Sequence, residues 1–168
     1  AGLRLAAPVS VLEQLALRMR VEPSGERADE LTFKERGATL SVRLVSEGAR
    51  LSARLDVPLG FDFELRELRE SDYYDFFSKP ELTFDDPAFD ETLLVRGEPL
   101  QTRRLLSPEL RSALIELARL ATPLQVDRLG LEATLTLRTP NADELWALVG
   151  AASAVLEGLQ PKRGPARA

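Results

Sequence analysis

Four segments between residues 31 and 66 alternate apolar with polar side chains, and only short turns separate them. A period of two residues is typical of a β-strand that buries one face and exposes the other. Connections of a few residues join strands that run antiparallel, so these segments predict a meander. The expected buried positions are Leu31 and Phe33; Leu40, Val42 and Leu44; Leu51, Ala53, Leu55 and Val57; and Phe61, Phe63 and Leu65.

A helix is predicted from Ser107 to Ala121. Ser107 can cap the first turn, Pro108 suits the first helical position, and Glu109 favours the positive end of the helix dipole. The helix has one apolar face, and the neighbouring strands offer a sheet against which that face can pack. The apolar residues recur at three- and four-residue spacing: Leu110, Ala113, Leu114, Leu117, Leu120 and Ala121.

Further elements complete the expected architecture. Strand patterns occur at 91–96, 124–126 and 131–137, and helical patterns at 8–20 and 141–159. The fold class is therefore expected to be α+β, with an antiparallel sheet of about six to seven strands and two or three helices packed on one face.

The length of 168 residues fits one domain with a core of its own. We expect a single α+β domain over residues 1–160 and a disordered basic tail over 161–168. No apolar run approaches the roughly 20 residues that span a bilayer, so no direct membrane insertion is expected in this fragment. Because the first residue is Ala1, we expect the sequence to be a processed form or a piece of a longer protein.

The chain contains neither cysteine nor histidine. These absences exclude disulfides, thiolate nucleophiles, sulfur-ligated metals, and every mechanism that needs an imidazole base. No glycine-rich phosphate loop of either standard pattern occurs. We therefore expect a protein that is not an enzyme and needs no cofactor.

Acidic residues concentrate in one segment. Residues 62–91 hold eleven acids and three bases, a charge of −8 within a chain of net charge −5. Such a chain lacks the concentrated basic face that nucleic acids require, so no nucleic-acid partner is expected. Clustered carboxylates can hold Mg²⁺ or Ca²⁺, which makes an oxygen-ligand metal-dependent hydrolase one alternative; the other is a solvated turn in which Asp86 acts as a cap. The candidate ligands are Asp85, Asp86, Asp90 and Glu91.

The leading hypothesis is a non-enzymatic protein-binding or scaffolding module. Four aromatic residues lie close together in an acidic stretch: Tyr73, Tyr74, Phe76 and Phe77. Aromatic side chains are enriched at the centres of interfaces, so this group is a candidate contact surface for another protein. The alternative is that these side chains fold back to cover the core.

Two further expectations concern partners. A homo-oligomer could form through an exposed sheet edge, because an unpaired edge strand is a template for another strand. A small-ligand carrier is a second functional alternative, with its ligand in a pocket between the sheet and the helices.

The second half of the chain resembles a soluble domain of uncharacterised bacterial proteins. The resemblance covers residues 85–160 and rests on an Asp86-Pro87-x-Phe89 segment, a strand, and a Leu106-Ser107-Pro108 helix start. These domains often occur beside membrane-spanning segments. The resemblance therefore implies a cytoplasmic domain that is tethered to the inner membrane by segments outside this sequence. It assigns no catalytic residue.

Overall fold

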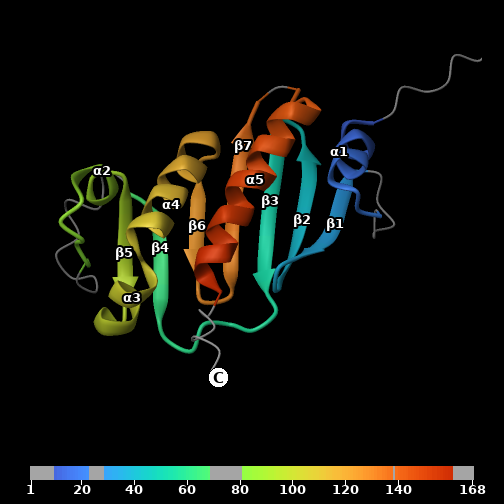
Figure 1. The fold of residues 1–168 in the computed structure, drawn as a ribbon. Helices are drawn as coiled ribbons and strands as arrows, with labels where there is room; N and C mark the ends of the chain where they lie inside the picture. The colour runs from blue at the N-terminus through green and yellow to red at the C-terminus, as the bar shows by residue number, and fades with distance from the viewer. Residues whose placement is uncertain (1–9, 23–28, 69–80, 138, 161–168) are drawn as a thin grey trace, which may run out of the picture.

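The computed structural model describes residues 10–22, 29–68, 81–137 and 139–160. Within these ranges seven strands form one antiparallel sheet (Figure 1). The order across the sheet is β1-β2-β3-β7-β6-β4-β5. The strands are β1 (Glu30–Glu35), β2 (Ala38–Val45), β3 (Gly48–Leu55), β4 (Phe63–Glu67), β5 (Leu93–Gly97), β6 (Leu124–Asp127) and β7 (Gly130–Thr136).

Five helices accompany the sheet in the described ranges, and in Figure 1 the three longest lie in front of it. The expected α+β class and the packing of helices on one face are confirmed. Two short helices, α2 and α3, were not predicted. The helices are α1 (Val11–Met19), α2 (Pro87–Asp90), α3 (Pro99–Leu105), α4 (Pro108–Leu120) and α5 (Ala142–Leu159).

The helix starts follow local capping chemistry. The Ser107 hydroxyl accepts from the Leu110 amide at 3.2 Å, as the sequence predicts for the start of α4. At α5, Asn141 and Glu144 form a capping box in which each side chain accepts from the backbone amide of the other residue. These caps fix where each helix enters the layer above the sheet.

One continuous hydrophobic cluster fills the space between the helices and the sheet. Leu110, Leu114 and Leu117 of α4 are all buried there, as predicted. Each fully buried leucine contributes about 1.5–3 kcal/mol relative to an exposed one, so this apolar face holds α4 on the sheet. Of the helices that the structure describes, none has the length and apolar composition needed to cross a bilayer.

Candidate functional site

The sheet has a second face, opposite the helices, which we call the outer face. Its side chains alternate with those of the core along each strand, so nearly all are polar or charged. The exceptions are Val45 and Leu94. The outer face comprises Glu30, Thr32, Lys34, Thr39, Ser41, Arg43, Val45, Arg50, Ser52, Arg54, Glu64, Arg66, Leu94, Arg96, Gln125, Asp127, Glu132, Thr134 and Thr136.

The outer face is hollowed at its centre. A concavity of about 670 Å³ extends across β2, β3, β7 and β6, and residues such as Ser41, Ser52 and Glu132 line it. Two smaller hollows of about 290 and 330 Å³ adjoin it, and Gln125 lines all three. The carrier hypothesis placed a ligand pocket between sheet and helices, but this hollow opens on the other side of the sheet.

Strand register places like charges next to each other on the outer face. Arg43 of β2 lies directly opposite Arg50 of β3, and Glu64 of β4 lies directly opposite Asp127 of β6. Like charges in directly opposed positions destabilise a sheet. The sequence therefore retains two unfavourable pairs on a face that the described helices do not cover.

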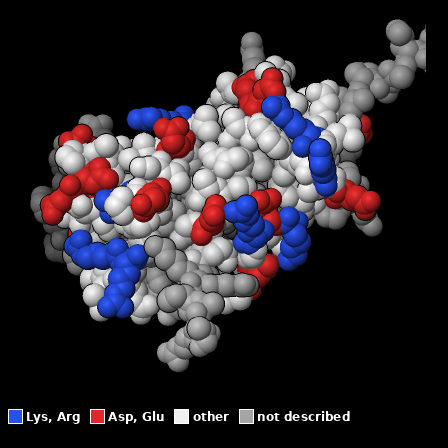
Figure 2. Space-filling model, viewed as in Figure 1, with Lys and Arg blue, Asp and Glu red and all other residues white. Residues whose placement is uncertain are grey.

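The charges divide the outer face into two halves. Its β1–β3 side is mainly basic, with Glu30 as the exception. Its β7–β6–β4 side carries Glu132, Asp127 and Glu64, with Arg66 of β4 as the exception, and Arg96 lies on the edge strand β5. On the helix side of the molecule, acidic and basic residues are instead interspersed (Figure 2).

Several of these charges have no partner within the described chain. Among the residues that the structure describes, Arg50, Arg54 and Glu132 make no hydrogen bond or ion pair, and all three are exposed. Other charges are partly used: Lys34 pairs with Asp56 at 3.1 Å, and Asp127 Oδ1 accepts from two amides of the β6–β7 turn. The unpaired groups remain available to a binding partner.

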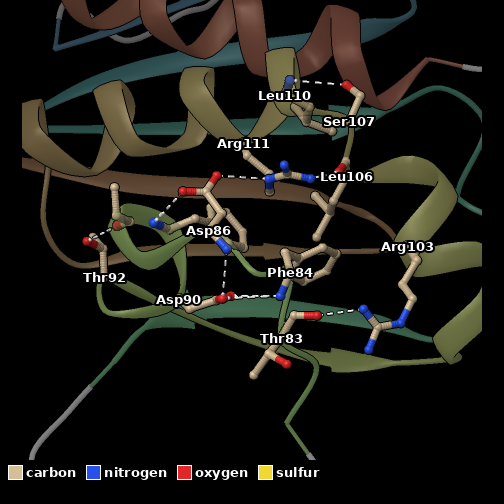
Figure 3. A network of polar contacts seen from close by, with 12 residues as sticks. Thr83, Phe84, Asp86, Asp90, Thr92, Arg103, Leu106, Ser107, Leu110 and Arg111 are labelled. Atoms are coloured by element: carbon tan, nitrogen blue, oxygen red, sulfur yellow. Dashed lines mark hydrogen bonds and ion pairs between the residues drawn. The ribbon is translucent and has the colours of Figure 1, made fainter.

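The predicted acidic cluster lies elsewhere, at the start of α2. Asp86 Oδ1 accepts from the Phe89 amide at 3.4 Å, and Asp86 Oδ2 lies 3.1 Å from Arg111 Nε (Figure 3). Asp90 accepts from the amides of Phe84 and Asp86 at 3.0 and 3.2 Å. Asp86 therefore acts as a cap in this turn, as the alternative interpretation expected, and its pair with Arg111, which the sequence did not predict, docks the turn on α4.

The structure offers no geometric support for the metal-dependent hydrolase. In the described parts of the chain, no group of three or more acidic side chains is arranged to hold a metal ion. Asp85 and Glu91, the other two candidate ligands, are both exposed beside this turn. Metal binding at Asp85, Asp86, Asp90 and Glu91 is not proposed further.

Two arginines close to this turn also make contacts within the fold. Arg103 of α3 donates to the Thr83 carbonyl at 2.5 Å, and its guanidinium lies 5.5 Å from the centre of the Phe84 ring (Figure 3). Arg111 lies 5.6 Å from the same ring, so Phe84 contacts two cations. These contacts fix the segment before α2 against α3 and α4.

A smaller groove lies between α1 and α5. It measures about 160 Å³, and Met19, Trp146 and Val149 are among its lining residues. Trp146 is 40% exposed, and the Arg18 guanidinium lies 4.8 Å from its ring centre. This groove is large enough for a side chain but not for a typical small-molecule ligand.

Comparison with known proteins gives a structural neighbour. No family model matches this chain, and no curated protein matches it. The fold is similar to the crystal structure of the mycobacterial trehalose monomycolate transport factor A, TtfA, with a TM-score of 0.52. The alignment covers 88% of this chain and 86% of TtfA at 14% identity. The two proteins therefore share a fold, and at this identity the likeness shows the fold alone.

The predicted contact surface and the observed outer face involve different residues. Tyr73, Tyr74, Phe76 and Phe77 lie outside the described residues, so their role stays a prediction. The sequence did not predict a binding role for the outer face, because the polar residues of an alternating strand indicate only that one of its faces is exposed to solvent. One signal was present: Arg43 and Arg50 are equally distant from the turn between β2 and β3, which predicts that they are opposite each other.

Proposed function

We propose that this chain is a non-enzymatic module that binds a protein partner through the outer face of its sheet. The observation that carries the proposal is that two pairs of like charges lie directly opposite each other on neighbouring strands, Arg43 with Arg50 and Glu64 with Asp127. Such pairs cost stability in the isolated chain. A partner that brings opposite charges to both sites would offset that cost, so the arrangement favours binding.

Only one of the two opposed arginines, Arg43, pairs with a carboxylate in the described parts of the chain. Arg43 Nε lies 3.7 Å from Asp29 Oδ2, whereas Arg50 has no ion pair in the described parts of the chain. The positive charge of Arg50 is therefore available to a carboxylate from a partner.

The shape of the outer face also supports a protein partner. Its central hollow is broad, polar side chains such as Ser41, Ser52 and Glu132 line it together with apolar ones, and Gln125 lines it and two neighbouring hollows. A polar, extended surface with unpaired charges suits the rim and hydrogen-bonding groups of another protein.

The structural neighbour is compatible with this proposal. The name of TtfA is that of a transport factor and mentions no enzymatic reaction. A scaffolding or binding role for the present chain, as the soluble part of a larger bacterial protein at the inner membrane, is a proposal that rests on the resemblance of residues 85–160.

Site-specific photo-crosslinking tests the proposal. Benzoylphenylalanine is introduced at Gln125, where the three hollows meet, in the natural full-length protein in its own cells. The matched control is the same substitution at Glu116, which is exposed on α4. We expect a crosslinked protein from Gln125 and none from Glu116. Crosslinks from Glu116 with none from Gln125 would overturn the proposal.

A further inference from the structure

We propose that the partner on the outer face is a second copy of this chain. The two copies would be related by a two-fold axis that runs parallel to the strands, between β3 and β7. This inference rests on the proposed function, because it takes the outer face as the docking surface and names what occupies it.

Charged side chains of opposite sign are separated on the outer face. Lys34, Arg43, Arg50 and Arg54 lie on β1, β2 and β3, to one side of the proposed axis. Glu132, Asp127 and Glu64 lie on β7, β6 and β4, to the other side, where Arg66 on β4 and Arg96 on β5 are the basic exceptions. A face with one basic and one acidic half is complementary to itself when the two halves are exchanged.

This charge distribution selects a single orientation of the axis. When two sheets stack face to face, a two-fold axis parallel to the strands places the basic half of each copy over the acidic half of the other. An axis across the strands would place basic on basic and acidic on acidic, which electrostatic repulsion opposes. The selected arrangement also keeps the strands of the two sheets roughly aligned, as in common sheet packings.

Three charged side chains near the proposed axis have no partner in the described parts of the chain: Arg50, Arg54 and Glu132. Ser52 of β3 lies directly opposite Glu132 of β7 in the sheet, with Arg50 and Arg54 on either side of Ser52 along the strand. The proposed axis exchanges β3 and β7. It therefore brings Glu132 of the second copy over Ser52, between the two arginines.

The central hollow fits this arrangement. Ser41, Ser52 and Thr39 have short side chains and line the hollow of about 670 Å³ together with Arg54 and Glu132. Short side chains leave room for the long arginine and glutamate side chains of the facing copy. The contact would be polar and charge-assisted, so its strength should depend on salt.

Oligomeric state is the first test. Sedimentation of the full chain is measured over a range of protein concentrations at about 50 mM and about 500 mM sodium chloride, because added salt shortens the screening length. We expect a dimer at low salt whose dissociation constant rises at least about tenfold at high salt. A monomer at every concentration and at both salt levels would overturn the inference.

Charge exchange is the second test, and it contains its own control for folding. Arg54→Glu and Glu132→Arg are each expected to abolish the dimer, because each places like charges together at both symmetry-related contacts. An equal mixture of the two variants should form a mixed dimer, in which both contacts are again between opposite charges. The protein that carries both substitutions should recover the homodimer for the same reason.

Matched changes on the helix side separate a general charge effect from the proposed contact. Arg119→Glu and Glu116→Arg alter two exposed residues of α4 that pair with each other at 2.8 Å. These variants should dimerise like the unchanged protein. Loss of dimer in them, or unchanged dimer in the Arg54 and Glu132 variants, would overturn the inference.

The result also separates this inference from the proposed function. If the chain is monomeric while Gln125 crosslinks to a different protein, the outer face is a docking surface but the second copy is not its occupant. If Gln125 crosslinks to nothing, the proposed function itself fails.

Discussion

Asp86 and Arg111 form an ion pair that joins α2 to α4, with 3.1 Å between Asp86 Oδ2 and Arg111 Nε. Their side chains are 30% and 17% exposed, so the pair is largely screened from solvent. Arg111 also donates to the Leu106 carbonyl at 2.8 Å. The Asp86 carboxylate, which was predicted as a possible metal ligand, is thus paired with a side chain of α4.

Arg111→Met should lower the free energy of unfolding by about 1–3 kcal/mol, because it leaves the Asp86 carboxylate and the Leu106 carbonyl without the arginine in a partly buried place. Urea denaturation measures the change. The control is Arg119→Met, which breaks an exposed pair with Glu116 and should cost less than about 0.5 kcal/mol. Equal losses of unfolding free energy in the two variants would show that burial does not strengthen the Asp86–Arg111 pair.

The acidic segment shows where prediction from sequence was limited. Asp86 followed by Pro87 is a capping signal, and the expected turn is present in the structure. The sequence could not show that Arg111, twenty-five residues away, supplies the charge that engages Asp86. A long-range pair of this kind depends on the packing of α2 against α4, which no local pattern contains.

Gly130→Ala should destabilise the fold by about 2 kcal/mol or more. Gly130 begins β7 with φ at +156°, and a Cβ there would lie 1.8 Å from the Ala53 carbonyl oxygen of β3. The backbone of the two strands would have to separate to admit the methyl group. Thermal unfolding followed by circular dichroism measures the loss.

Gly150→Ala is the matched control and should have the opposite sign. Gly150 lies within α5, and no atom lies within 4 Å of the position where its Cβ would be. Alanine favours a helix over glycine, so the variant should gain about 0.4–1 kcal/mol. A loss of stability at Gly150 would contradict this account of the two glycines.

The fold was predictable to the extent that periodicity determines it. Seven strand patterns and the three long helices were expected, and all are present. Helix α3 was not predicted, although the Glu98 side chain caps its start by accepting from the amides of Leu100 and Gln101 at 3.2 and 2.7 Å. Seven residues are too few to show a helical repeat, so only the cap and Pro99 could have indicated this helix.

Leu114→Ala should cost about 2–5 kcal/mol, because Leu114 is fully buried between α4 and the sheet and its removal leaves a cavity. Leu120→Ala, in the last turn of the same helix, changes a side chain that is 39% exposed. Its cost should be clearly smaller. Chemical denaturation of the two variants compares them directly, and similar losses would contradict the observed orientation of α4.

Arg50→Thr should weaken association through the outer face without lowering the stability of the fold. The substitution removes the repulsion between Arg50 and the directly opposed Arg43, and threonine is well suited to a strand. The free energy of unfolding should therefore stay the same or rise by about 0.2–1 kcal/mol. Association through the outer face should weaken, because Arg50 is one of the unpaired charges available to a partner.

The decisive measurement for Arg50→Thr combines denaturation with the sedimentation and crosslinking assays on one preparation. Arg119→Thr on α4 is the control, since it also replaces an exposed arginine but lies on the helix side of the molecule. A gain in stability together with weaker association, seen for Arg50 and not for Arg119, is the expected pattern. If Arg50→Thr instead destabilises the chain and leaves association unchanged, Arg50 serves the fold, and its position opposite Arg43 does not mark a binding surface.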